Sequence, residues 1–313
     1  MKLLIEIPTW IGDAVMATPA IENIANYYNK PEIILIGSFV AVETLKNNPK
    51  VSGAHILEKK YMDLYKLAKK LGEFDVFFSF RSSFHAKFLK FIVLANKKFQ
   101  FNKNKYNNRH QVEQYNDFVN DSLNISSPAG QLRIYTKNSK KNISKKILGI
   151  NPGATYGSAK RWYPQKFAEV VGKLSKQFDI IIFGSTNEKD FAKEIEKLLI
   201  AKGINNYQNL VGKTTITELI NCISNIDLFI TGDSGPMHLA ASFQIPTIAI
   251  FGPTKDDETS QWMNDNGIVV KKNLDCQPCM KRTCRLKHHN CMKLIKAQEI
   301  IDSVPRVFQV SSL

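Results

Sequence analysis

The chain has 313 residues and a formal net charge of +15, and 43% of its residues are hydrophobic and 10% aromatic. This length is sufficient for two domains that each bury a core, and the composition excludes an intrinsically disordered protein. No apolar run approaches the roughly 20 residues of a membrane-spanning helix, which excludes an integral helical membrane protein. A soluble globular enzyme is therefore the class that we expect.

The positive charge favours partners that carry phosphate, namely nucleic acid, anionic lipid headgroups or a phosphorylated substrate. The excess lysines are spread along the chain as separate doublets. A nucleic-acid-binding arm would concentrate them in one basic block. The apolar run at residues 3–7 is too short and too quickly interrupted for a signal peptide, which predicts a cytoplasmic location.

The first half of the chain alternates short apolar runs with helical patterns. The predicted elements are strands at Lys2–Ile7, Glu32–Gly37 and Asp75–Phe80, and helices at Asp13–Tyr28, Val40–Asn47 and Gln111–Leu123. This alternation indicates parallel strands joined by crossover helices. Phe84, Phe88 and Phe91 could rest on lipid or form the buried face of a helix, and we favour the buried face.

A polar, lysine-rich segment at Lys137–Asn142 predicts an interdomain linker, after which the pattern restarts. The later elements are strands at Ile147–Asn151, Ile180–Phe183, Leu228–Thr231 and Thr247–Phe251, and helices at Pro164–Lys176, Glu188–Leu199, Ile216–Ile223, Met237–Phe243 and Gln298–Phe308. We therefore predict an α/β fold with two Rossmann-like domains, residues 1–142 and 143–295, whose parallel sheets face a central cleft. Residues 296–313 form a C-terminal helix, for which a return to the first domain is one option.

The stretch Gly232–His238 follows an apolar run and leads into an Ala-rich segment, which indicates a strand, a tight turn and a helix start. Backbone N–H groups and the positive end of the helix dipole at such a turn suit an anion. The alternative is an ordinary strand-to-helix turn. In open α/β sheets ligands bind at the carboxyl ends of the strands, so we expect this turn to line a binding cleft, with the turns at 10–13, 152–160 and 184–186.

These turns carry motifs that resemble the ADP-heptose:lipopolysaccharide heptosyltransferases. The motifs are IPTWIGDAVM at 7–16, NPGA at 151–154 with KRW at 160–162, and GDSGPMH at 232–238 with FGPT at 251–254. Within this family, the Cys-rich segment 276–292 and RHQVEQY at 109–115 point to the heptosyltransferase II branch, which adds the second heptose of the inner core.

The resemblance implies a GT-B glycosyltransferase of EC class 2.4 that inverts the sugar it transfers. The donor would be ADP-L-glycero-β-D-manno-heptose, bound by the C-terminal domain. The acceptor would be a phosphorylated lipid A–Kdo–heptose, bound by the N-terminal domain. The resemblance further implies a monomer with peripheral contact to the anionic inner membrane at its cytoplasmic face, no nucleic-acid partner and no cofactor required for catalysis.

Asp13 follows the first predicted strand and matches the position of the family's proposed general base. Inverting transfer needs a group that takes the proton of the acceptor hydroxyl as this attacks the anomeric carbon, and a carboxylate can do so. The alternative is a helix N-cap, because Gly-Asp before an apolar run is a common helix start.

By the same resemblance, Lys160 contacts the donor diphosphate and acts with Asp13 in catalysis, because a cation there neutralises charge on the departing ADP. The further donor-binding residues are Thr155, Thr214, Asp233, Ser234, Gly235 and His238, of which His238 has an equally weighted alternative role in the helix core. For the acceptor we name Arg81, Lys87 and Arg109.

Four cysteines, Cys276, Cys279, Cys284 and Cys291, lie close together in the sequence. In a reducing compartment such a cluster suggests a structural zinc site rather than disulfides, although its spacing is not that of a standard zinc finger. Reduced, packed thiols are the alternative. Lys287 stands where the family commonly has glycine, which puts the local turn in question.

Three rival functions remain at this point. Heptosyltransferase I uses the same donor but adds heptose to Kdo, and a related glycosyltransferase could use another nucleotide sugar. A basic, zinc-containing nucleic-acid-binding protein would explain the charge and the cysteines. It leaves Asp13, Lys160 and the Asp233 turn unexplained.

Overall fold

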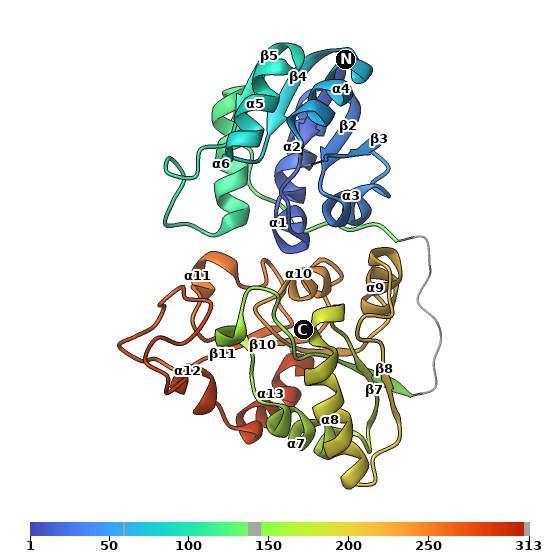
Figure 1. Ribbon diagram of the computed structural model, residues 1–313, viewed down its shortest axis with the longest axis vertical. Helices are drawn as coiled ribbons and strands as arrows, with labels where there is room; N and C mark the ends of the chain where they lie inside the picture. Colours follow the sequence, from blue (N-terminus) through green and yellow to red (C-terminus); the bar gives the residue numbers. More distant parts are fainter. Residues whose placement is uncertain (59, 137–144, 310–313) are drawn as a thin grey trace. The chain divides into compact units, whose positions relative to one another are not determined.

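The computed structural model describes residues 1–58, 60–136 and 145–309, and the chain divides into two compact units, Met1–Lys137 and Asn138–Leu313. Figure 1 shows unit 1 in blue to green and unit 2 in green to red. The predicted linker at Lys137–Asn142 lies outside the described residues.

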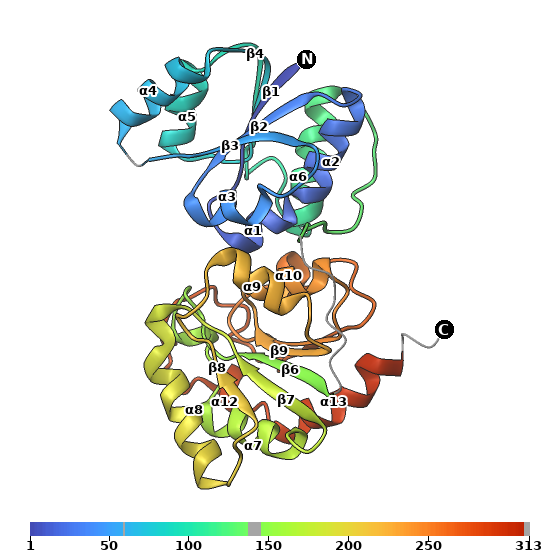
Figure 2. The same ribbon diagram turned by 90° about the vertical axis from the view of Figure 1, so that its right-hand side faces the viewer.

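Unit 1 is built on a parallel sheet whose strands follow the order β3-β2-β1-β4-β5. The strands are β1 (Lys2–Glu6), β2 (Glu32–Gly37), β3 (Val51–Ile56), β4 (Glu73–Ser79) and β5 (Leu94–Gln100). The helices are α1 (Ile11–Met16), α2 (Thr18–Tyr27), α3 (Phe39–Leu45), α4 (Tyr61–Leu71), α5 (Phe84–Ile92) and α6 (Gln111–Leu123). Helices α2 and α6 pack together on one face of the sheet, and α4 and α5 on the other (Figure 2). The central strand β1 is therefore covered on both faces, which explains its continuous apolar run.

The single helix predicted over Asp13–Tyr28 is wrong, because the structure divides it at Ala17 into α1 and α2. Pro19 has no N–H to donate to the carbonyl of Val15 four residues earlier. The hydroxyl of Thr18 donates to that carbonyl instead, at 2.7 Å. The chain thus keeps this buried acceptor bonded while it changes helix.

Unit 2 repeats the design with a parallel sheet in the order β11-β10-β9-β6-β7-β8. The strands are β6 (Lys146–Asn151), β7 (Phe178–Ile182), β8 (Tyr207–Asn209), β9 (Leu228–Gly232), β10 (Thr247–Ile250) and β11 (Gly267–Val270). The α-helices are α7 (Pro164–Leu174), α8 (Lys189–Ala201), α9 (Ile216–Ile223), α10 (Gly235–Ser242), α11 (Asp256–Thr259), α12 (Asn290–Lys293) and α13 (Ala297–Gln309), and two short 3-10 turns, η1 (Ser158–Lys160) and η2 (Thr186–Glu188), precede α7 and α8.

The C-terminal helix α13 packs against α7, β10 and β11, and so lies in unit 2. Its buried side chains Ile300, Val304 and Val307 join the apolar core that also holds Leu148 and Ile230 of the sheet. Figure 2 shows α7, α8 and α13 on one face of this sheet and α9 and α10 on the other.

The predicted α/β fold with two parallel sheets is confirmed, since each unit carries a doubly wound parallel sheet. In unit 1 the chain builds β2 and β3 on one side of β1 and then continues with β4 and β5 on the other side. In unit 2 it builds β7 and β8 on one side of β6 and then β9, β10 and β11 on the other. The points at which the strand order reverses, the switch points, therefore lie between β1 and β4 and between β6 and β9. The loops at the carboxyl ends part at these switch points, and open α/β sheets bind ligands there. Within the residues that the structure describes, no helix combines the length and apolar character needed to span a membrane.

The buried face that we favoured for the phenylalanines of α5 is wrong for two of them. Phe84 is 80% exposed and Phe91 is 82% exposed, while Phe88 is half-buried. The helix instead turns Ala86 and Leu89 toward the sheet, and both are buried.

Candidate functional site

The switch point of unit 2 brings together two charged side chains that are 73 residues apart in sequence. Lys160 ends the loop after β6, and Asp233 begins the turn after β9. The Nζ atom of Lys160 lies 2.5 Å from Oδ2 of Asp233, and the hydroxyl of Thr254 donates to the same oxygen at 2.7 Å. The side chains of Lys160 and Asp233 are only 12% and 8% exposed, so this ion pair is largely removed from water. The ion pair thus holds the Lys160 ammonium group at the point where open parallel sheets bind ligands.

The turn after β9 also supplies the amino end of α10, whose first N–H groups have no partner within the helix. Gly235 is the first residue of that helix and Pro236 the second. The hydroxyl of Ser234 points inward, 3.0 Å from Thr231 Oγ1, and accepts a hydrogen bond from Asn151 at 3.3 Å. What Ser234 can offer a ligand is therefore its backbone N–H rather than its side chain.

The other predicted donor-binding residues occupy different positions around this turn. Thr155 is exposed in the loop after β6, and Thr214 is half-buried immediately before Thr215, the N-cap of α9. His238 lies inside α10 and is 3% exposed, a position that suits packing. Donor binding by these three residues stays a prediction.

Glu188 was missed by the sequence analysis, which assigned it to the start of a helix. It is buried at the end of η2 and accepts a hydrogen bond from the Ser185 N–H at 2.6 Å. A Cβ atom on Gly153 would lie 2.0 Å from the carboxyl carbon of Glu188, so this carboxylate is packed between the loops that follow β6 and β7. A glutamate four residues after the strand-end Gly184 was the only signal for it.

The Cys-rich segment packs against the loop that carries Lys160 and accepts hydrogen bonds from it. The N–H of Ala159 donates to the Arg282 carbonyl at 3.0 Å, and the Tyr156 hydroxyl donates to the Met280 carbonyl at 2.8 Å. The Nζ atom of Lys160 lies over the Tyr156 ring, 4.8 Å from its centre. The segment thus fixes both the backbone beside Lys160 and the ring under its ammonium group.

Four thiols of this segment gather around a cavity of about 230 Å³, whose wall also includes Ala159 and Pro253. The thiols are those of Cys276, Cys279, Cys284 and Cys291. The pKa of the Cys291 thiol is raised to about 11, mainly by burial and further by the neighbouring Cys279, Cys284 and Cys276. This thiol therefore stays neutral at pH 7.

The zinc site suggested for these cysteines is not formed. Among residues 1–58, 60–136 and 145–309, no three His, Cys, Asp or Glu side chains are arranged so that they could hold a metal ion. The thiols come from a long loop and from α12, and they line a cavity rather than converge on one point. Lys287 has φ +58°, the left-handed conformation that glycine adopts most easily, so the turn is kept although lysine stands where the family commonly has glycine.

If the turn binds the donor diphosphate that the resemblance implies, Gly157→Ala is expected to weaken ADP binding without unfolding the protein. A Cβ atom at this position would lie 2.3 Å from the Arg282 carbonyl oxygen, so the Lys160 loop and the Cys-rich segment must separate. Calorimetric titration with ADP measures the effect, which we place at about tenfold or more, or at least 1.4 kcal/mol.

The matched control is Gly172→Ala on α7, where the added methyl meets its nearest neighbour at 3.5 Å, an ordinary contact. Equal ADP affinity in the two variants would show that the Cys-rich segment does not set the position of the Lys160 loop.

Asp13 lies in the first turn of α1 in unit 1, just after the carboxyl end of β1. The helix N-cap is Trp10, so the alternative interpretation of Asp13 as the N-cap is wrong. Asp13 is half-buried, and its charge adds to burial in raising the pKa of the Tyr115 hydroxyl well above its usual value. A carboxylate thus stands at the switch point of the first sheet, beside a phenol that stays protonated.

Arg81, predicted to bind the acceptor, follows β4 at the same switch point. Its guanidinium donates to Oε1 of Glu6 at 3.1 Å, and the Ser79 hydroxyl donates to Oε2 at 2.5 Å. Burial dominates at Glu6 and raises the pKa of its carboxyl, although Ser79 and Arg81 act to lower it. Glu6 was missed because the sequence analysis placed it inside the buried strand predicted at Lys2–Ile7. The hydrogen bond to Glu6 fixes the Arg81 guanidinium at the carboxyl ends of β1 and β4.

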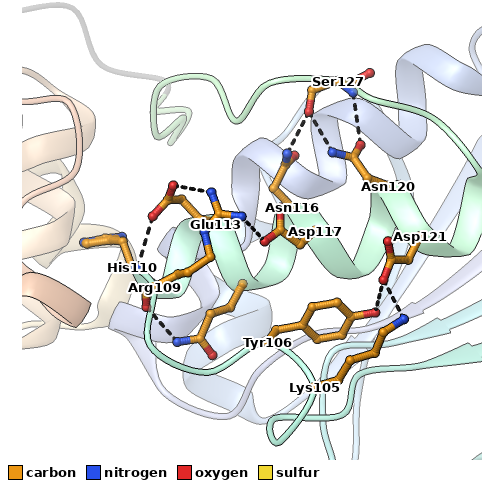
Figure 3. A network of polar contacts seen from close by, with 11 residues as sticks. Lys105, Tyr106, Arg109, His110, Glu113, Asn116, Asp117, Asn120, Asp121 and Ser127 are labelled. Atoms are coloured by element: carbon orange, nitrogen blue, oxygen red, sulfur yellow. Dashed lines mark hydrogen bonds and ion pairs between the residues drawn. The ribbon is translucent and has the colours of Figure 1, made fainter.

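Arg109 is held in a polar network at the start of α6 (Figure 3). Its guanidinium donates to Glu113 at 2.7 Å and to Asp117 at 2.5 Å, so its charge is already shared with two carboxylates. His110 caps the helix, with Glu113 completing the capping box. Lys87 lies on α5, exposed beside Phe84, with its Nζ 5.5 Å from the ring centre. Each of the predicted acceptor residues thus has its own setting, and only Arg81 is at the switch point.

Comparison with known proteins identifies one family. The model of glycosyltransferase family 9 (heptosyltransferase) matches residues 78–290. A lipooligosaccharide heptosyltransferase 2 of Campylobacter jejuni is 42% identical, and the alignment covers 100% of this chain and 100% of that relative. A second protein of that name, from another C. jejuni serotype, is 41% identical and covers 98% of this chain and 99% of its own.

Two solved structures share the fold. The Escherichia coli ADP-heptose LPS heptosyltransferase II aligns with a TM-score of 0.83 at 19% identity, covering 100% of each chain. An E. coli heptosyltransferase solved with ADP aligns with a TM-score of 0.77 at 14% identity, covering 98% of this chain and 100% of its own. Together with the family match and the full-length relatives, these likenesses show that the chain is a glycosyltransferase that belongs to family 9, the heptosyltransferases.

Proposed function

We propose that the chain is a heptosyltransferase II that moves L-glycero-D-manno-heptose from ADP-heptose to the first heptose of the lipopolysaccharide or lipooligosaccharide inner core. The observation that carries the proposal is the buried Lys160–Asp233 pair at the switch point of unit 2. The names of the full-length C. jejuni relatives support the choice of sugar and acceptor.

Unit 2 would hold the donor at the carboxyl edge of its sheet. The Lys160 ammonium and the N–H groups of Ser234 and Gly235 suit the diphosphate. Asp233 can exchange Lys160 for sugar hydroxyls, because a carboxylate accepts from several donors. The loop before α9, with Thr214, would contact the adenine, and the Glu188 carboxylate beside Gly153 would accept from a ribose hydroxyl.

Unit 1 would supply the base and bind the acceptor. In the transfer step the acceptor oxygen attacks the anomeric carbon from the face opposite ADP, and its proton passes to the Asp13 carboxylate. A new carbon–oxygen bond forms while the bond between that carbon and the β-phosphate oxygen breaks. ADP leaves with the bonding electrons, and the anomeric configuration inverts. The positive charge of Lys160 stabilises the departing diphosphate most strongly as this bond breaks.

Arg81 is the best-placed acceptor residue, because Glu6 fixes its guanidinium at the sheet edge that also carries Asp13. A planar guanidinium suits the phosphate or carboxylate groups that an inner-core acceptor carries. The acceptor is lipid-anchored, so we expect the enzyme to work at the membrane surface of the cytoplasm.

ADP is expected to bind saturably, with one site per chain, and to be displaced by ADP-heptose. Calorimetric titration measures this, with UDP and GDP as competitors to test another nucleotide sugar and duplex DNA to test the nucleic-acid alternative. Displacement of ADP by DNA would contradict the proposal, and so would tighter binding of UDP or GDP than of ADP.

A further inference from the structure

Helices α4 and α5 of unit 1 turn a set of large apolar side chains toward solvent. Phe84 and Phe91 are 80% and 82% exposed, which is unusual for phenylalanine. We call this set the α4–α5 surface; its apolar members are Tyr61, Met62, Tyr65, Phe84 and Phe91.

The surface is distinct from the core beneath it. The side chains that α4 and α5 bury against the sheet are Ala68 and Leu89, which join a cluster with Phe74 and Phe77. The outer side of α5 carries a second stripe, Phe84, Lys87, Phe88 and Phe91, at the spacing of one helix face. The helix is thus apolar on two sides, and only one of them is needed for folding.

Aromatic contacts join the two helices into one surface. The Tyr61 ring stacks on the His85 ring with 4.6 Å between centres and meets the edge of the Phe88 ring at 4.9 Å. Figure 2 shows α4 and α5 side by side on the same face of the sheet. The exposed rings therefore stand on a fixed platform rather than on a loop.

The charge around these rings is mainly positive. Residues 60–100 contain eight lysines and one arginine against three acidic residues. On α4, Lys66 and Lys69 share a helix face with Met62 and Tyr65, and all four side chains are exposed. On α5, Lys87 lies between Phe84 and Phe91 on the outer stripe. Apolar rings and cations are thus interleaved on a single face.

We infer that the α4–α5 surface docks the protein on a bilayer that carries anionic headgroups. The rings would enter the boundary between headgroups and acyl chains, and the lysines would bind lipid phosphates at the same depth. Charge complementarity favours this occupant over a second copy of the chain, whose matching surface would bring like charges together.

Co-sedimentation with vesicles tests the inference without any sugar substrate. The full chain is mixed with vesicles of phosphatidylglycerol and phosphatidylethanolamine, or of phosphatidylcholine alone. We expect binding to the first that weakens as salt rises, and little binding to the second. Phe84→Ser/Phe91→Ser should weaken binding by at least about tenfold, because each ring loses its burial in the interface. Lys66→Gln/Lys69→Gln should weaken it by about fivefold for each lysine at low salt.

The matched control is Ile200→Ser/Leu286→Ser, which removes two side chains of unit 2 that are 65% and 61% exposed. It should bind vesicles like the wild type. The inference is overturned if the wild type binds neither vesicle, or if the phenylalanine variant binds as well as the control. It is also overturned if that variant loses a dimer, seen by analytical ultracentrifugation without lipid, while its vesicle binding is unchanged.

The outcome is independent of the proposed function. The vesicles contain no acceptor, and transfer to a water-soluble, delipidated acceptor should be unchanged in Phe84→Ser/Phe91→Ser. Loss of vesicle binding with normal transfer would support the surface alone. Vesicle binding by a protein that transfers no heptose would leave the surface standing and contradict the proposed function.

Discussion

Asp13→Asn is expected to lower the turnover number for heptose transfer by about 10²–10⁴-fold and to leave ADP affinity unchanged. The reason is that the amide cannot take the proton of the attacking hydroxyl, which is worth about that factor in general base catalysis. The substitution keeps the shape of the side chain, and Asp13 belongs to unit 1, whereas the donor groups belong to unit 2. Single-turnover transfer to a delipidated acceptor and calorimetric titration with ADP measure the two effects separately.

Asp63→Asn is the matched control for this variant. Asp63 also lies in the first turn of its helix, α4, where the N-cap side chain makes no capping bond, so both aspartates interact with a helix dipole. Loss of that interaction costs about 0.3–1 kcal/mol of stability in each case. If Asp13→Asn lowers stability like the control and still transfers heptose at the wild-type rate, Asp13 is a structural residue.

Lys160→Met is expected to reduce both donor binding and turnover, the latter by about 10²–10³-fold, because no cation remains to stabilise the departing diphosphate. It should also destabilise unit 2. Removal of the ammonium leaves the Asp233 carboxylate buried, with Thr254 as its one remaining side-chain partner among the residues that the structure describes, and such a loss costs about 3–5 kcal/mol. Chemical unfolding and transfer assays measure the two losses.

A second substitution separates stability from chemistry at this pair. Asp233→Asn in the Lys160→Met background removes the stranded charge, so most of the stability should return while activity stays lost. Lys145→Gln is the control, because it breaks an ion pair with Asp179 at the amino ends of β6 and β7, away from the carboxyl ends that carry Lys160 and Asp233. Full activity in Lys160→Met would contradict the role given to Lys160.

The central strands could be predicted from the sequence because each is a continuous apolar run buried on both faces. The edge strands β3 and β5 were missed for the opposite reason. Their sequences, VSGAHI and LANKKFQ, include exposed polar residues and show no such run. Helix α4 was missed too, although its buried Leu64 and Ala68 stand at helical spacing.

The places of Asp13 and Asp233 in the fold could be predicted, because a strand, a turn and a helix follow each other in sequence there. The pairing of Lys160 with Asp233 could not, because it depends on β6 and β9 being neighbours in the sheet. Glu6 and Glu188 were missed because their position in the fold, not their local sequence, makes them unusual. Phe84 and Phe91 were assigned to the wrong side, since helical spacing alone cannot tell which apolar face meets the sheet.

The most direct test of the proposed function is transfer from ADP-heptose to two purified acceptors, one ending in Kdo and one in a single heptose. Mass spectrometry of the products reports the addition. We predict that the heptose-terminated acceptor gains one heptose and that the Kdo-terminated acceptor gains none. Transfer to the Kdo-terminated acceptor alone would make the enzyme a heptosyltransferase I, and transfer to neither would contradict the assignment of ADP-heptose as its donor.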